Sequence, residues 1–206
     1  MTASTSRGPY AKTAEVRRRI IEACMGAFGE AGFRGATMKD IAQRAGISLT
    51  GLLHHFPRKE DLLLAMLELR DRRSAQFLES AEALHPKERP VEALRGMLGV
   101  LVENELRPGL IELHCILSAE ATSPGHPAHE FYAQRYRTLR QFYADVFTAL
   151  AERDELRSDI APESLATITI SLINGLQQQW LFDRESVHVE RAIRMFLLSV
   201  IPGLDG

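Results

Sequence analysis

The chain has 206 residues, of which 45% are hydrophobic and 25% are charged, a composition typical of a soluble globular protein with room for two modest domains or one elongated one. Its two cysteines, Cys24 and Cys115, lack the short-range partners that a zinc site or a redox pair would need, so we expect two buried thiols in a reducing compartment. No apolar run of signal-peptide type follows the charged N-terminus, and we therefore expect a cytoplasmic protein.

The charge of the chain is distributed unevenly. The net charge is −2, which argues against a general affinity for nucleic acid. Residues 1–60 contain ten Lys or Arg and five Asp or Glu, a balance of +5, whereas residues 61–206 contain fifteen and twenty-two, a balance of −7. A basic head on an acidic body is the pattern expected of a DNA-binding protein with a separate second module.

Helical spacing of apolar residues dominates the chain, and no segment alternates like a strand bounded by hairpin signals. We therefore predict an all-α fold of about nine helices, with borders at Gly and Pro residues. A flexible arm is expected over residues 1–12. Helices are expected at about 13–30, 37–45, 49–56, 58–83, 90–105, 109–121, 128–153, 162–183 and 188–201.

The longest stretch without a charged residue, 164–182, approaches the length of a membrane-spanning helix. It contains Asn174, Gln177, Gln178 and Gln179 together with several Ser and Thr, a polar load that fits a helix buried between protein surfaces better than a helix in lipid. The alternative is an ordinary core helix of a monomer.

The segment 38–56 has the pattern of a helix-turn-helix. Such a motif needs a small residue where the two helices cross and a residue that tolerates positive φ in the turn, which Ala42 and Gly46 supply. Ile41, Ile47 and Leu52 provide apolar anchors beneath both helices. The second helix would then be held at a fixed angle, ready to enter a DNA major groove.

Capping residues precede both of these helices. Thr37, with Asp40 three residues later, predicts a start resembling a capping box, and Ser48 is a favoured N-cap for the second helix. Short helical pairs around a Gly turn also occur in plain helical bundles, so the spacing alone leaves DNA binding and simple packing both open.

A longer set of residues carries a family resemblance. They are Ile20-Ile21-x-Ala23 and Phe28, Gly32-Phe33-x-x-Ala36-Thr37, Ile41-Ala42, Ala45-Gly46-Ile47-Ser48, Gly51-Leu52, His55-Phe56, Lys59 and Leu62-Leu63, together with the segment LINGLQQQWLFD at 172–183. In these residues the sequence resembles the tetracycline-repressor (TetR) family of transcriptional regulators. The resemblance implies a DNA-binding domain over 13–60, a ligand-binding and dimerisation domain over 61–206, and a repressor that binds a palindromic operator as a homodimer and is released by a small molecule.

The resemblance also implies which residues face the DNA. Ser48, Leu49, Thr50, Gly51 and His54 would face the groove, while Thr37 and Lys59 would contact phosphate. Lys39 and Arg44 would add attraction that does not depend on sequence, as would Arg7, Lys12, Arg34 and Arg58, and His55 belongs to the same motif. One departure stands out, because the family commonly has a phosphate-binding Tyr where this chain has Leu53.

The last two predicted helices are expected to form the dimer interface, as in the family. Their uncharged surface and the apolar stripe of the final helix are fuller than one core contact requires. The residues assigned to this interface are Leu172, Leu176, Val189, Ala192, Ile193, Phe196, Leu197 and Val200. A two-fold dimer would present its recognition helices to half-sites about 34–36 Å apart.

A pocket for an apolar or amphipathic effector is expected inside the bundle. The residues assigned to it are Met97, Leu101, Leu113, His114, Leu117, Phe131, Tyr132, Tyr136, Gln177 and Trp180. Cys115 could converge on the same region.

Two rival hypotheses remain at this stage, a helical-bundle enzyme or small-molecule carrier and a protein-interaction module. The sequence contains no nucleophile with a base at motif spacing, no paired-carboxylate signature and no Gly-rich phosphate loop, so we expect neither enzymatic activity nor a cofactor. Adjacent residues on a helix point about 100° apart. The pairs His114-Cys115 and His54-His55 therefore cannot chelate one ion, and no metal is expected.

Overall fold

The computed structural model describes residues 9–80 and 85–205, which fold into nine α-helices and one short 3₁₀ helix, with no strand in these ranges. The predicted all-α class is confirmed. The helices are α1 (Pro9–Gly35), α2 (Met38–Arg44), α3 (Leu49–His55), α4 (Lys59–Ser80), α5 (Pro90–Glu105), α6 (Pro108–Glu120), α7 (His129–Glu152), α8 (Pro162–Phe182) and α9 (Val189–Val200), and η1 spans Pro202–Asp205.

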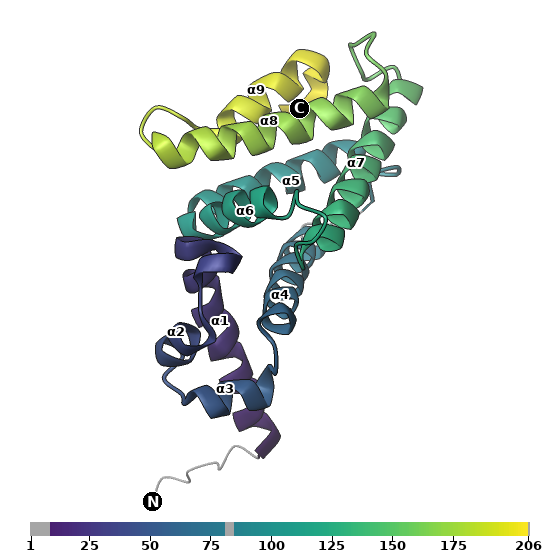
Figure 1. Cartoon of the computed structure of the whole chain (residues 1–206). Coiled ribbons are helices and arrows are strands. Elements are labelled where there is room, and N and C mark those ends of the chain that lie inside the picture. Colours follow the sequence, from purple (N-terminus) through teal and green to yellow (C-terminus); the bar gives the residue numbers. More distant parts are fainter. Residues whose placement is uncertain (1–8, 81–84, 206) are drawn as a thin grey trace, which may run out of the picture.

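The helices form an elongated molecule with α1–α3 at one end and α8 and α9 at the other (Figure 1). Helix α4 runs from the head formed by α1–α3 toward the body, where α5, α6 and α7 lie between the two ends (Figure 1). One hydrophobic core fills the head and extends into α6 and α7 through Leu113, Leu117 and Tyr132. A second core joins α5, α7, α8 and α9. The head is therefore anchored to the body by shared packing and not by α4 alone.

Helix α1 differs from its prediction at both ends. It begins at Pro9, so residues 9–12 of the expected arm are helical, whereas residues 1–8, with Arg7, lie outside the described residues. At the other end the expected break occurs at Gly32, but as a kink, with φ 69° and ψ 178°, after which a final turn runs to Gly35. The predicted end of the α4 helix at residue 83 also lies outside the described residues.

The kink at Gly32 makes room for a side chain of α6. Oε2 of Glu120 accepts a hydrogen bond from the backbone N–H of Phe33 at 2.7 Å. A Cβ placed on Gly32 would lie 2.6 Å from Oε1 of the same carboxylate. This backbone conformation belongs almost exclusively to glycine. Gly32 therefore permits a direct tie between α1 in the head and α6 in the body.

The turn between α2 and α3 forms as the sequence predicts. Thr37 Oγ1 accepts a hydrogen bond from the N–H of Asp40 at 3.1 Å, and Ser48 Oγ accepts one from Gly51 at 3.0 Å. Gly46 lies in the turn with φ 66°. The carboxylate of Asp40 accepts a hydrogen bond from Arg44 at 3.1 Å, so the Thr37 half of the expected capping box is present and the carboxylate serves another partner.

Helix α8 holds the uncharged stretch that approaches membrane-spanning length. None of the helices in the described parts of the chain is long and apolar enough to cross a membrane. One face of α8 packs into the body through residues such as Leu165, Ala166 and Ile170, and Gln177 is buried on the same helix. Gln178 and Gln179 are exposed, so within a single chain α8 is buried on one face only, and the burial of its other face stays a prediction.

Candidate functional site

The tip of the head presents one face of α3 that other elements leave uncovered. Leu52 packs inward and is fully buried, which fixes the helix on the head core. Thr50 and His54 are exposed on the same helix, and so are the large apolar side chains of Leu49 (42%) and Leu53 (40%). The uncovered part of α3 therefore combines two exposed leucines with two exposed polar side chains, and it is available to contact another molecule.

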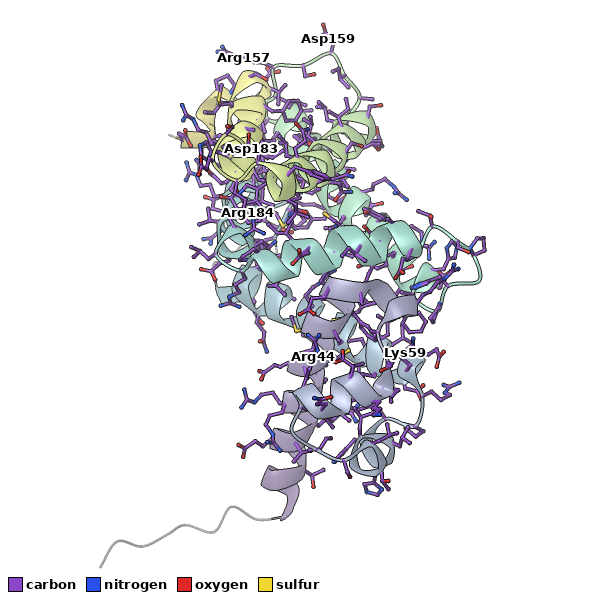
Figure 2. All side chains as sticks on the ribbon, turned by 60° about the vertical axis from the view of Figure 1, so that its left-hand side comes forward. Arg44, Lys59, Arg157, Asp159, Asp183 and Arg184 are labelled. Atoms are coloured by element: carbon purple, nitrogen blue, oxygen red, sulfur yellow. The ribbon has the colours of Figure 1, made fainter. Side chains whose placement is uncertain are left out.

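Two of the basic residues assigned to DNA, Arg44 and Lys59, are held within the head (Figure 2). Arg44 donates hydrogen bonds to both carboxylate oxygens of Glu30 at 2.7 Å, and this contact lowers the pKa of Glu30. Lys59 donates to the carbonyls of Phe33 at 2.7 Å and Ala36 at 3.0 Å, and its ammonium lies 4.5 Å from the centre of the Phe33 ring. Both side chains thus already have partners in the protein, and the structure gives each of them a role in joining segments of the head.

The remaining residues assigned to DNA lie around the same tip. Lys39, Thr37 and Ser48 are exposed beside the turn, and His55 is half-buried at the end of α3. The carbonyl of His55 accepts a hydrogen bond from Arg17 at 3.3 Å. Arg17 is not among the residues predicted to contact DNA. Its guanidinium also lies 4.1 Å from the centre of the Phe56 ring and therefore braces the C-terminal end of α3. The only sequence signal for it is the run Arg17-Arg18-Arg19 on α1.

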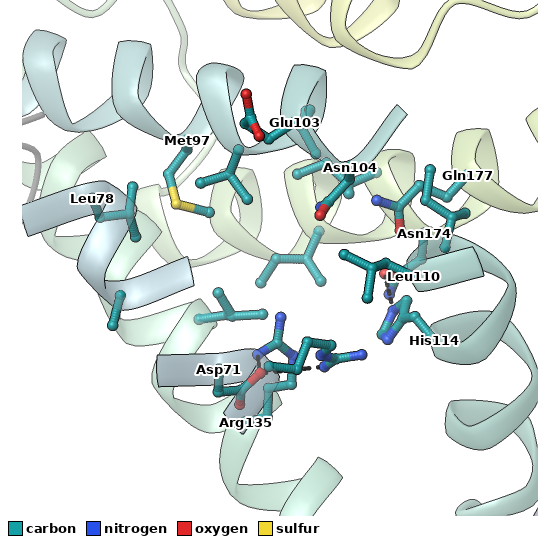
Figure 3. Close-up of a pocket in the computed structure, with 18 of the residues that line it drawn as sticks. Asp71, Leu78, Met97, Glu103, Asn104, Leu110, His114, Arg135, Asn174 and Gln177 are labelled. Carbon is teal, nitrogen blue, oxygen red and sulfur yellow. Dashed lines mark hydrogen bonds and ion pairs between the residues drawn. The ribbon is translucent and has the colours of Figure 1, made fainter. Parts of the chain in front are cut away.

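A cavity of about 480 Å³ lies in the body, within the size range of small-molecule sites. Helices α4, α5, α6, α7 and α8 line it, and so does Met25 of α1. Figure 3 shows Leu78, Met97 and Leu110 among the side chains around it. Most of its wall is apolar, with Met97, Leu110, Leu139 and Ile173 among the lining side chains. The cavity can therefore accommodate an apolar guest, and it borders both the head and the body.

Charged groups of α4 and α7 meet at one side of this cavity (Figure 3). Arg135 on α7 donates a hydrogen bond to Oδ1 of Asp71 on α4 at 2.5 Å. Arg70 donates to the same oxygen at 3.3 Å and is only 9% exposed. The side chains of Arg135 and Asp71 are both half-buried, so this ion pair is partly shielded from water and ties α4 to α7.

A second polar group in the cavity links α6, α7 and α8. Nε2 of His114 lies 3.3 Å from Oδ1 of Asn174, and Asn174 donates a hydrogen bond to the hydroxyl of Tyr136 at 3.0 Å. Burial, and then the nearby charges of Arg70 and Arg135, lower the pKa of His114 to about 3. The imidazole is therefore neutral at physiological pH.

The atoms that face each other fix the direction of this chain of hydrogen bonds. Because Oδ1 of Asn174 can only accept, Nε2 of His114 carries the proton and donates to it. Asn174 in turn donates to the Tyr136 hydroxyl, so that hydroxyl keeps a proton to give to a guest.

The cavity includes half of the residues assigned to an effector. Met97, Leu101, His114, Tyr136 and Gln177 line it. The other five lie elsewhere because they serve as packing: Leu113, Leu117, Tyr132 and Phe131 belong to the head core or pack against it, and Trp180 belongs to the body core with the guanidinium of Arg184 4.8 Å from its ring centre. The polar lining residues Arg70, Asp71, Arg135 and Asn174 are missing from the sequence assignment, because charged residues on helices usually face solvent.

The residues assigned to a dimer interface divide into two groups. Val189, Ile193 and Leu197 are 1% exposed and lie in the core of their own chain, since α9 needs an apolar face to dock on α5 and α8. The others keep exposed surface: Leu172 is 36% exposed, and Leu176, Ala192, Phe196 and Val200 are half-buried. The outer surface of α8 and α9 also carries exposed Ile168, Phe182 and Met195.

Both cysteines carry free thiols. Cys24 is buried in the head core as expected, whereas Cys115 is only half-buried against the body core. Within the described ranges no group of three or more His, Cys, Asp or Glu is placed to hold a metal ion.

Two family models match the chain. Residues 20–66 match the model of bacterial regulatory proteins of the tetR family, and residues 90–198 match the C-terminal domain of BetI-type transcriptional repressors. The first match covers the head and the start of α4, and the second covers the cavity-bearing body.

Similar proteins and structures agree with these matches. The chain is 31% identical over 189 residues to the HTH-type transcriptional regulator UidR of Escherichia coli K12, covering 91% of this chain and 92% of that protein. It is 25% identical over 193 residues to the HTH-type regulator AcrR of Shigella flexneri, covering 91% and 88%.

Among solved structures, the SmeT–triclosan complex superimposes with a TM-score of 0.74 at 21% identity, covering 92% of this chain and 94% of that one. SmeT is the repressor of a Stenotrophomonas maltophilia multidrug efflux pump. A transcriptional regulator from Saccharomonospora viridis in complex with choline gives 0.72 at 24% identity, covering 91% and 98%. At these identities the two structures show a shared fold.

Proposed function

Since the chain belongs to the TetR family of bacterial transcriptional regulators, we propose that it is a cytoplasmic repressor that binds a palindromic operator as a homodimer and is released when a small organic effector enters the cavity. The observation that carries this proposal is the pairing, in one chain, of an uncovered α3 face with a cavity at the far part of α4. No observation favours the alternative of an enzyme or carrier.

The DNA-binding part of the proposal rests on the exposed side chains of α3. Thr50 and His54 can donate to or accept from base edges, and Leu49 can contact a thymine methyl group. Ser48 and Thr37 occupy N-cap positions, where helix N-termini attract phosphate. Because Arg44 and Lys59 have partners inside the head, we assign them to holding the head together and give Lys39 the phosphate contact.

The dimer part rests on the outer face of α8. Ile168, Leu172, Gly175 and Phe182 recur at helical spacing, and Phe182 is 87% exposed. A Cβ on Gly175 would meet nothing within 4 Å, so the backbone of a second copy could approach closely there. Burying such a patch against its own copy is the usual role of an exposed apolar surface at a two-fold interface.

The release part rests on the tie between α4 and α7. Helix α4 begins directly after α3 and lines the cavity through Arg70 and Asp71, so a guest that changes the Asp71–Arg135 contact changes the position of α4. An effector can shift the equilibrium only by its difference in affinity between the two states. We therefore expect the effector to favour a state in which the two recognition helices no longer match the operator spacing.

Operator binding is the first experiment. The purified chain is titrated with a palindrome-bearing DNA fragment from beside its own gene and with random DNA, across a salt series. We expect tight, sequence-dependent binding by a dimer. Equal affinity for the fragment and for random DNA would contradict the proposal for that fragment. If every palindrome flanking the gene bound no more tightly than random DNA, the proposal would be contradicted altogether.

Amino-acid substitutions then test which residues form the DNA-binding surface. Replacing both Thr50 and His54 by Ala should remove the preference for the operator over random DNA, because both side chains reach base edges. Lys39→Ala should weaken binding to both DNAs and reduce the salt slope by about 1. Lys87→Ala, which removes an exposed cation far from the head, is the matched control and should leave the slope unchanged. A loss of the same size with Lys87→Ala would reject the assigned surface.

A further inference from the structure

The charged residues of the cavity do not balance. Among the described residues that line it, the cations are Arg70, Arg107 and Arg135 and the carboxylates are Asp71 and Glu103. Arg107 and Glu103 are exposed and lie 3.6 Å apart, so they compensate each other near solvent. Asp71 lies against both Arg70 and Arg135, so among the described lining residues the cavity side of α4 and α7 carries two cations and one carboxylate.

This pair of cations is largely shielded from water. The side chain of Arg70 is buried, at 9% exposed, and that of Arg135 is half-buried, at 25% exposed. Nε of Arg135 is fully buried and makes no hydrogen bond. Burial lowers the pKa of the Arg135 guanidinium, and the like charge of Arg70 lowers it further. A buried cation of this kind is costly unless an anion accompanies it.

We propose that the effector is an organic monocarboxylate on an apolar body, whose carboxylate binds Arg135 and Arg70 and competes with Asp71 for them. The inference rests on the proposed function and names the chemical class of its effector. One carboxylate matches one excess positive charge, and the planar guanidinium fork suits a carboxylate in particular.

The rest of the cavity determines the body of the molecule. Met97, Leu110, Leu139 and Ile173 line the space away from the arginines, and a hydrocarbon or aromatic group there would be removed from water. The Tyr136 hydroxyl, which lines the same cavity and keeps a proton to give, would donate to a second oxygen of the guest. A cation such as choline, which occupies the similar structure from Saccharomonospora viridis, would add to the excess positive charge here, so the two sites should select opposite charges.

Three probes with one tail separate charge from hydrophobicity. Decanoate, decanamide and decyltrimethylammonium are titrated separately into the full-length protein by calorimetry, below their micelle concentrations. We expect decanoate to bind at least about tenfold more tightly than decanamide, in line with a hydrogen bond to a charged group, and the cation to bind most weakly. Equal binding of decanoate and decanamide, preference for the cation, or no binding of any probe would overturn the inference.

Two variants of the ion-pair cluster should act in opposite directions. Arg135→Gln leaves Asp71 paired with Arg70 and removes the excess charge, so the preference for decanoate over decanamide should fall to near one. Asp71→Asn removes the competitor, so the same preference should rise several-fold above that of the unmodified protein. Arg135→Lys keeps the charge without the planar fork, so its preference for decanoate should lie between those of Arg135→Gln and the unmodified protein.

A purely structural role for the cluster would weaken binding of all three probes in both variants. Circular dichroism of each variant checks that it is folded, and the Asp71→Asn gain cannot arise from damage. A loss of preference in Asp71→Asn would overturn the inference.

Operator binding is measured on the same preparations. Specific operator binding combined with indifference to the charge of the probe would reject the carboxylate and leave the proposed regulator intact. Absence of specific operator binding, with decanoate still preferred, would reject the regulator and keep the carboxylate site.

Discussion

Replacing Gly32 by Ala should destabilise the protein far more than an ordinary surface substitution. At φ 69° and ψ 178° the backbone is in a region that only glycine adopts without strain, which costs another residue about 1–3 kcal/mol. The new Cβ would lie 2.6 Å from Oε1 of Glu120 and would displace the carboxylate from the N–H of Phe33. A hydrogen bond to a charged group contributes about 1.5–3 kcal/mol, so the total cost is roughly 2.5–6 kcal/mol.

Gly46→Ala is the matched control, because Gly46 also has a positive φ, 66°, but its added Cβ would meet nothing within 4 Å. It should cost only the backbone strain, about 1–2 kcal/mol. Urea unfolding followed by far-ultraviolet circular dichroism, at one fixed protein concentration, measures both variants. Equal losses in the two variants would mean that Glu120 plays no part.

The double variant Gly32→Ala with Glu120→Ala tests the same contact from the other side. Without the carboxylate there is no clash and no hydrogen bond left to lose, so the Gly32 substitution should cost only its strain in that background. The double variant should therefore lose less stability than the two single variants lose in total, because the residues are in contact. Full additivity would refute the tie between α1 and α6.

Three other substitutions or conditions have defined outcomes. Lowering the pH from 7 to 5 should remove roughly 2 kcal/mol of stability through His114, because its native pKa of about 3 lies below the unfolded value of about 6.5, so the unfolded chain gains a proton that the native chain does not; His114→Gln should flatten this part of the pH–stability curve measured by urea unfolding. Leu172→Glu should shift the protein from dimer to monomer in sedimentation velocity, whereas Ile160→Glu, at an exposed site in the loop before α8, should leave the dimer; dimers in both would place the interface elsewhere. Arg44→Ala should leave the salt slope of operator binding nearly unchanged, because Glu30 and Asp40 already compensate that charge, and a slope reduced by about 1 would restore Arg44 to the phosphate contacts.

The local features of the head could be predicted because each depends on residues close in sequence. The Thr37 and Ser48 caps act over three residues, and the turn at Gly46 needs only one residue that accepts positive φ. The start of α1 was harder to locate, because residues 1–12 show no apolar periodicity, although Pro9, at which the helix begins, is a residue favoured in the first turn.

The polar side of the cavity could not be predicted, because its partners come from distant segments. Asp71 and Arg135 are 64 positions apart on two helices, and each alone resembles a solvated surface charge. Aromatic residues gave the opposite error, in which residues of the core were predicted to line the cavity. Tyr132 and Trp180 were assigned to the cavity, but each has its own core to fill. Helical spacing identifies a buried face without saying whether that face borders packing or empty space.

The internal partners of Arg44 and Lys59 also bear on how a regulator of this kind would search a chromosome. Each phosphate contact releases condensed counterions, and this release drives binding to any DNA regardless of sequence. Because these two cations already pair with groups inside the head, the head releases fewer counterions from DNA when it binds. Such a protein would spend less time on unrelated DNA, and its hold on the operator would depend more on matching bases than on the ionic strength of the cell.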